Sequence, residues 1–142
     1  MARKRKAVDG KRYVGQRIAR VRKASQRRQI RWDVETGERF EETIPFTQDA
    51  LGQRLMPYLG AAWTGRQVSD AERGKRALDA VELYAFSAVL RVPVGWFFEL
   101  DPGQKEQEIE MPGPANVTLV NQQEWQKHLE EERHLWDQEA LS

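Results

Sequence analysis

The 142-residue sequence contains no cysteine, which excludes disulfide bridges and thiolate metal sites. A chain without cysteine is consistent with a reducing compartment. No apolar run approaches the ~18 residues that a membrane span needs, and no apolar segment of the secretory type follows the basic N-terminus. We therefore expect a cytoplasmic chain that does not enter a membrane.

Catalytic motifs are also missing. The sequence has no Walker loop, no glycine-rich dinucleotide fingerprint and no Ser/His/Asp set in a supporting context. The two histidines, His128 and His134, are six residues apart, which is not metal-ligand spacing on a helix. We expect no enzyme activity, no cofactor and no metal site.

Acidic residues are nearly absent from the N-terminal third. Residues 1–31 hold 13 Lys or Arg side chains against the single Asp9, whereas residues 101–142 hold 3 basic and 10 acidic side chains. The formal net charge of +1 conceals this asymmetry. It favours an anionic partner for the N-terminal third, with a merely solvated tail as the alternative.

Composition and periodicity divide the chain into segments. Residues 1–12 are predicted to be a basic disordered arm, and residues 13–100 a helical domain with a β-hairpin inserted at about residues 27–45. Residues 101–116, rich in Pro, Gly, Gln and Glu, are predicted to be a linker, and residues 117–142 an acidic helix. The expected fold class is mainly all-α, with five helices in the domain, one inserted hairpin and a C-terminal helix.

The inserted hairpin is predicted from a change of period. Ile30, Trp32 and Val34 alternate with polar residues, a turn sequence follows, and Phe40 and Ile44 again share a parity. Helical spacing does not fit this stretch.

Four segments resemble, in order, the helices of the lambda-repressor-like (Xre) helix-turn-helix family. Residues 14–22 resemble its first helix, residues 47–52 the start of its second, residues 68–76 its third helix and the following turn, and residues 83–97 its fourth and fifth. The resemblance implies a sequence-specific transcriptional regulator that binds double-stranded DNA, typically a dimeric repressor on a palindromic operator. The chain departs from the family in having longer connections after the first and second helices.

The resemblance also implies roles for particular residues. The third helix would read base edges in the major groove through Arg66, Gln67, Ser69 and Asp70. Phosphate contacts would come from the starts of the second and third helices and from the loop after the third: Thr47, Gln48, Thr64, Gly65, Lys75 and Arg76. Arg22 and Glu72 would form a structural ion pair. Further contacts are possible from the arm and the hairpin, through Arg3, Lys4, Arg5, Lys6, Arg27, Arg28 and Arg31.

Several alternatives stay open. The hairpin is either a wing that touches a neighbouring groove, a dimer contact, or packing against the core. The stripe of Trp125, Leu129, Trp136 and Ala140 is expected to be buried on the domain, across a homodimer or on another protein. The last case describes an antitoxin-like or phage-encoded interaction module that binds a protein partner through residues 117–142. A nonspecific nucleoid-type binder that uses the basic arm is a third hypothesis.

Overall fold

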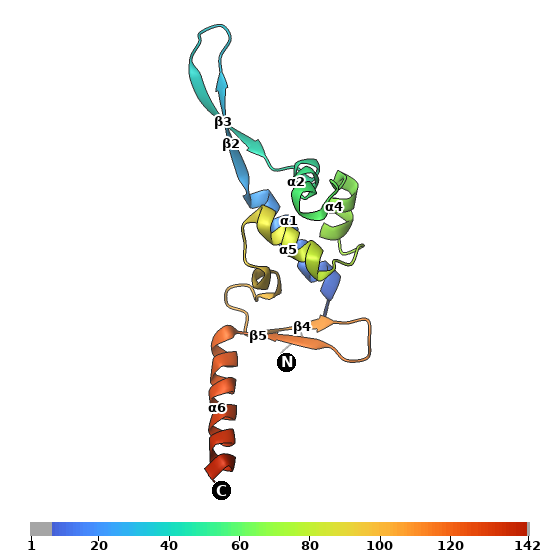
Figure 1. Ribbon diagram of the computed structural model, residues 1–142, viewed down its shortest axis with the longest axis vertical. Helices are drawn as coiled ribbons and strands as arrows, with labels where there is room; N and C mark the ends of the chain where they lie inside the picture. Colours follow the sequence, from blue (N-terminus) through green and yellow to red (C-terminus); the bar gives the residue numbers. More distant parts are fainter. Residues whose placement is uncertain (1–6, 142) are drawn as a thin grey trace, which may run out of the picture. The chain divides into compact units, whose positions relative to one another are not determined.

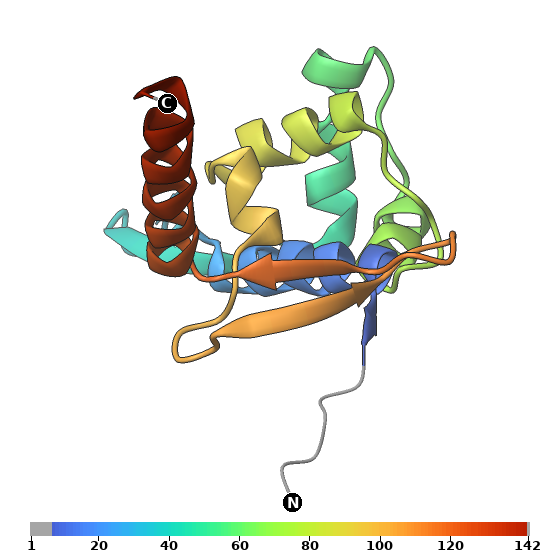
Figure 2. The same cartoon turned by 90° about the horizontal axis from the view of Figure 1, so that it is seen from below.

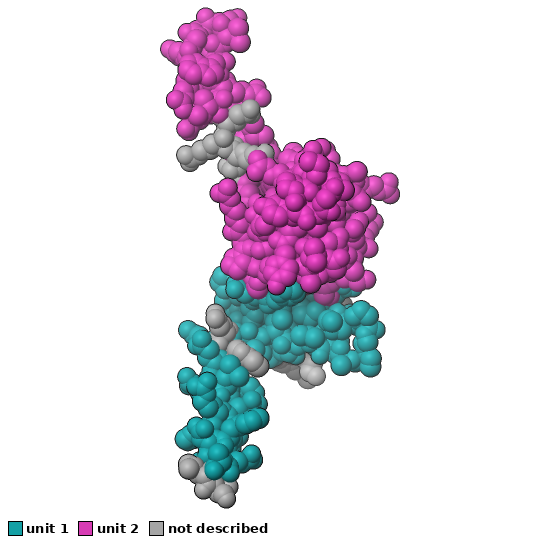
Figure 3. Space-filling model, viewed as in Figure 1, with its two compact units in different colours: residues 1–9, 98–142 teal, residues 10–97 magenta. Residues whose placement is uncertain are grey.

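The chain forms two compact units (Figure 3). A computed structural model describes residues 7–141, apart from the side chains of residues 26–29, 122, 124, 125 and 141. Gly10–Phe97 form one unit, here called the helical unit. Residues 1–9 and 98–142 form the other, here called the terminal unit.

Five α-helices and a 3-10 helix make up most of the helical unit. They are α1 (Gly10–Ala24), α2 (Gln48–Arg54), α3 (Met56–Leu59), α4 (Gly65–Glu72), α5 (Ala80–Leu90) and η1 (Val94–Phe98). Three of them start at a capping side chain, because Thr47, Thr64 and Asp79 each accept a hydrogen bond from a backbone N–H in the first turn. Such caps satisfy N–H groups that have no partner within the helix.

The second predicted helix is interrupted in the structure. Leu55 ends α2 and precedes α3, whose first turn contains Pro57. Proline has no N–H to donate and its ring clashes with a continuing helix, so the chain restarts at this point. Gly60 then ends α3 in the left-handed conformation, with φ of 80°.

The core of the helical unit lies among α1, α2, α4 and α5, which are grouped together in Figures 1 and 2. Its largest fully buried side chains are Phe86, Phe97, Ile18, Leu51, Leu55 and Val68. A Cβ at Gly15 would overlap the carbonyl oxygen of Ala71, so only glycine lets α1 approach α4 this closely. Arg17 is also buried, and its Nε donates to the Trp96 carbonyl at 2.8 Å.

The inserted hairpin consists of β2 (Gln26–Trp32) and β3 (Arg39–Pro45), paired antiparallel. Ile30 lies opposite Glu41, and Arg31 lies opposite Phe40. Ile30 and Trp32 therefore share one face, whereas Phe40 lies on the other, so the apolar residues do not form a single apolar side. The described side chains of both strands are exposed, except for the half-buried Ile44, so they do not pack against the core.

The terminal unit contains a second sheet, with the order β1-β4-β5. The strands are β1 (Val8–Asp9), β4 (Glu106–Glu110) and β5 (Val117–Val120), and α6 (Gln122–Leu141) follows the last of them. The prediction of a mainly all-α chain with one hairpin is therefore wrong. The described residues form a mixed α/β structure with two sheets, of two and three strands.

The physical reason for this error lies in β4 and its pairing. β4 has a single apolar residue, Ile109, and its Gln- and Glu-rich sequence resembles a linker by composition. It pairs in parallel with β1, with Val8 beside Ile109. Local periodicity cannot reveal a pairing between segments a hundred positions apart. In β4, glutamates alternate with Gln107 and Ile109, which the structure buries, and this alternation was a weak strand signal in a short segment.

Within a single chain, helix α6 does not bury the stripe predicted from its sequence, and burial across a homodimer or on another protein stays a prediction. Leu129, Trp136 and Ala140 are exposed, and Trp136 keeps 74% of its surface accessible. The side chain of Trp125 lies outside the described residues. Between residues 7 and 141, no helix combines the length and the apolar character needed to cross a bilayer.

Candidate nucleic-acid interface

Helix α4 has one side buried in the core and the other side facing solvent. Val68 and Ala71 are buried in the core, whereas the residues at positions 66, 69, 70 and 73 share the opposite face. Arg66 is exposed and forms no hydrogen bond or ion pair with another described residue. Arg73 lies 3.5 Å from Asp70 in an exposed ion pair. The face therefore offers one uncommitted guanidinium beside an Arg/Asp pair.

Gln67 has a different role from the base contact expected for it. Its side-chain oxygen accepts a hydrogen bond from the backbone N–H of Thr64 at 2.8 Å, and its own N–H donates to the Thr64 hydroxyl at 3.2 Å. The two residues form a capping box that fixes the start of α4. The Thr-x-x-Gln spacing that signals this motif is present in the sequence.

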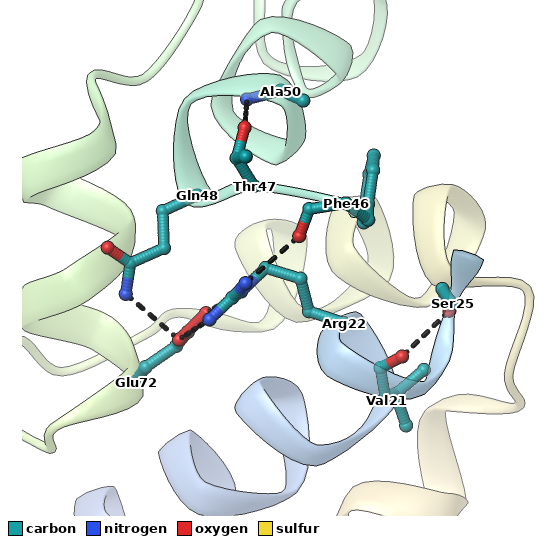
Figure 4. Close-up of polar contacts among 8 residues, drawn as sticks. All are labelled: Val21, Arg22, Ser25, Phe46, Thr47, Gln48, Ala50 and Glu72. Atoms are coloured by element: carbon teal, nitrogen blue, oxygen red, sulfur yellow. Dashed lines mark hydrogen bonds and ion pairs between the residues drawn. The ribbon is translucent and has the colours of Figure 1, made fainter. Parts of the chain in front are cut away.

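Arg22 and Glu72 form the ion pair that the family resemblance implies (Figure 4). The guanidinium of Arg22 donates to both carboxylate oxygens, at 2.7 and 2.9 Å, and to the carbonyl of Phe46 at 2.9 Å. Gln48 also donates to Glu72, at 3.1 Å. This network ties α1, the start of α2 and the end of α4 together, and such bidentate charged bonds hold geometry firmly.

A shallow cavity of about 770 Å³ opens beside this network. Its cationic lining side chains outside the Arg22–Glu72 pair are Arg20, Lys23 and Arg73, and Thr47, Gln48 and Ser69 also contribute. The cavity therefore combines positive charge with hydroxyl and amide groups, which is the chemistry that binds phosphate oxygens.

Arg20, Lys23 and Arg73 were not among the residues expected at the interface. On α1, positions 16, 20 and 23 are separated by four and three residues, so they follow one face opposite the buried Ile18. That spacing was a usable signal in the sequence. The contribution of Arg73 depended on how α4 crosses α1, which only the folded structure defines.

Four of the six residues expected at phosphates do not line the cavity, namely Thr64, Gly65, Lys75 and Arg76. Lys75 is exposed beyond the end of α4, and Arg76 stacks over the Trp63 ring at 4.1 Å while pairing with Glu82 at 3.0 Å. Gly65 instead makes room for a carboxylate, because a Cβ there would overlap the side chain of Asp49.

Thr64 does not line the cavity either. Its hydroxyl is the acceptor in the capping box of α4, so this side chain serves the start of the helix. Thr47 also caps its own helix, with its hydroxyl 3.1 Å from the Ala50 nitrogen, yet it remains exposed at the cavity.

The predicted arm and wing contacts are only partly described. Arg3, Lys4, Arg5 and Lys6 lie outside the described residues, as do the side chains of Arg27 and Arg28. Arg31 pairs with Glu42 across the hairpin at 3.1 Å, and both side chains are about half exposed.

Comparison of the chain with protein-family models, curated proteins and solved structures found no match. Among the described residues, no cluster of three or more His, Asp or Glu side chains is arranged to hold a metal ion.

Proposed function

We propose that the protein is a sequence-specific DNA-binding transcriptional regulator of the lambda-repressor-like type, with α4 as the helix that enters the major groove. The observation that carries the proposal is the Arg22–Glu72–Gln48 network beside a cavity lined with cations. It fixes three helices around one exposed face of α4. A rigid helix with a polar outer face and positive charge beside it suits a groove flanked by phosphates.

In this proposal, most contacts to DNA phosphates are made by residues that line the cavity. Arg20, Lys23 and Arg73 supply charge, and Thr47 and Gln48 supply polar groups at the start of α2. Each phosphate neutralised by such a cation releases counterions, so affinity should fall steeply with salt. Lys75 and the basic residues at positions 3–6 would add to this term without reading sequence.

Base reading is assigned first to Arg66. Its side chain is exposed on α4 and has no partner among the described residues, so it is available to the O6 and N7 atoms of guanine. Ser69 and Asp70 share this face, although Asp70 is engaged by Arg73. Gln67 is committed to the capping box through its oxygen and contributes to the position of α4 instead.

The similarity of residues 14–100 to the lambda-repressor-like family supports the same function. In that family the regulator acts as a dimer, with each copy placing one recognition helix in a half-site of a palindromic operator. We extend this expectation to the present chain as a cytoplasmic, nucleoid-associated homodimer.

A binding-site selection with the purified full-length protein, followed by titrations on selected and random DNA, tests the proposal. Arg66→Ala should weaken binding to the selected site by about 1–3 kcal/mol and relax the preference at one base pair, because a bidentate contact is lost. The matched control is Arg54→Ala, which removes an exposed arginine of α2 that does not line the cavity. Failure to select any sequence would contradict the proposal, and equal losses on both DNAs would assign Arg66 to phosphate.

A further inference from the structure

The β2–β3 hairpin exposes large apolar side chains that nothing described in the chain covers. Trp32 keeps 66% of its surface accessible, Ile30 47% and Val34, in the turn, 99%. The sheet has only two strands, so each strand has an unpaired outer edge (Figure 1). A two-stranded hairpin in water is marginally stable at best, so these features indicate a surface that becomes covered.

The two faces of the hairpin differ in their charges. On the face of Phe40, Arg31 and Glu42 satisfy each other in an ion pair. On the face of Ile30 and Trp32, the charged residues with described side chains are Arg39 and Glu41, and neither forms an ion pair with a described residue. Arg28 occupies the next register position on the same face, and its side chain lies outside the described residues. Among the described side chains, this face therefore combines the exposed tryptophan with one positive and one negative charge that do not pair with each other or with other described residues.

This face is complementary to itself. Ile30 and Glu41 form one cross-strand level, and Trp32 and Arg39 form the next level on the same face. Two such faces can pack against each other around a two-fold axis that lies between them and runs perpendicular to the strands. This rotation reverses the strand direction of the second copy, so that its first level lies over the second level of the first copy. Ile30 of one copy then meets Trp32 of the other, and Glu41 meets Arg39. Both contacts occur twice, as a two-fold interface requires.

We propose that the hairpin is a dimerisation arm, and that its Ile30/Trp32 face docks on the same face of a second copy of this chain. The pairing buries apolar side chains and neutralises two pairs of opposite charges. The proposal does not depend on DNA binding, but it would supply the second α4 for a second half-site.

The charges at the tip argue against a DNA groove as the occupant. Asp33, Glu35 and Glu38 form the turn with no basic residue among them, and all three are exposed. Inserting three carboxylates between phosphate backbones would be repulsive. A second copy of the hairpin can avoid such repulsion, because this face presents charges of both signs, with Arg39 and Glu41 at neighbouring cross-strand levels.

Charge exchange provides the test, with the mass of the full-length protein measured by analytical ultracentrifugation. Glu41→Arg alone and Arg39→Glu alone each place like charges opposite one another, and each should weaken dimerisation by about tenfold or more. An equimolar mixture of the two variants should form a heterodimer. The double exchange Arg39→Glu/Glu41→Arg should restore the homodimer, which a folding defect could not do.

The matched control exchanges the charges of the opposite face. Arg31→Glu/Glu42→Arg retains an ion pair within the hairpin and should leave the dimer unchanged. A monomeric wild-type chain, or single variants that dimerise like wild type, would overturn the proposal. Single variants that lose DNA affinity at unchanged mass would also overturn it and identify the hairpin as a wing.

Discussion

Helices α5 and α6 both carry large apolar residues, yet these residues lie in opposite environments. Phe86 of α5 is fully buried among residues of α1, α2, α4 and η1, whereas Trp136 of α6 stays 74% exposed. Apolar residues occur on most sides of α5, whereas α6 carries a stripe of them in a mainly polar and charged sequence. The exposed stripe of α6 shows that periodicity predicts a helix and one of its faces, but a second apolar surface must exist for that face to be buried.

The largest expected effect comes from truncating one aromatic residue in each helix. Phe86→Ala should lower the free energy of unfolding of the helical unit by about 3–5 kcal/mol, because it removes a fully buried ring that contacts Trp63 edge-on. Trp136→Ala should change it by less than about 0.5 kcal/mol. Urea denaturation of both variants, followed by far-ultraviolet circular dichroism, measures the two values. A comparable loss for Trp136→Ala would show that α6 is covered in solution.

A second pair of variants applies the same comparison to carboxylates. Glu72→Ala should lower the stability by about 3 kcal/mol or more, because Arg22 is left nearly buried without its counter-charge and Gln48 loses its acceptor. Glu131→Ala, on the exposed surface of α6, is the control and should be near neutral. Thermal melts of the two variants provide the readout. An unchanged melting temperature for Glu72→Ala would contradict the structural role of the network.

The smallest expected effect concerns the hairpin turn, whose order depends on local contacts. The backbone N–H groups of Glu35 and Thr36 donate to Asp33 and lower the pKa of its carboxyl group. A lowered pKa means that the turn is stabilised above the unfolded pKa of about 3.9, and that this stabilisation is lost as the pH falls through the lower folded value. Amide chemical shifts of Glu35 followed against pH should report the transition. Asp33→Asn keeps an oxygen acceptor and should abolish it, whereas a transition above pH 4 would contradict the assignment.

The parts of the fold that the sequence predicted are those that depend on residues close to one another along the chain, such as helix ends and hairpins. Thr47 and Gly60 bound the second and third helices, and the alternation after Ile30 indicates a hairpin. The pairing of β1 with β4 was not predictable, because the two strands lie near opposite ends of the chain and β4 has only Ile109 to mark it.

The candidate interface also has a part that the sequence predicted and a part that it did not. Its recognition helix and the Arg22–Glu72 pair follow from the resemblance of the helix sequences, but the resemblance also assigned Gln67 and Arg76 to DNA. Gln67 lies in a capping box and Arg76 between Trp63 and Glu82. Arg20 and Lys23 from α1 instead join Arg73 at the cavity. Which polar groups remain available depends on the crossing of α1 and α4.

The sequence by itself determined the capped starts of the helices, the presence of a hairpin at about residues 27–45 and the uneven distribution of charge, because these properties depend on residues within a few positions of one another. Only the tertiary structure decided the second sheet, the opposed faces of the hairpin and the composition of the cavity. Those depend on strand register and on helix crossing. A shift of one residue in register moves every side chain to the other face, and local spacing contains no information about the partner strand.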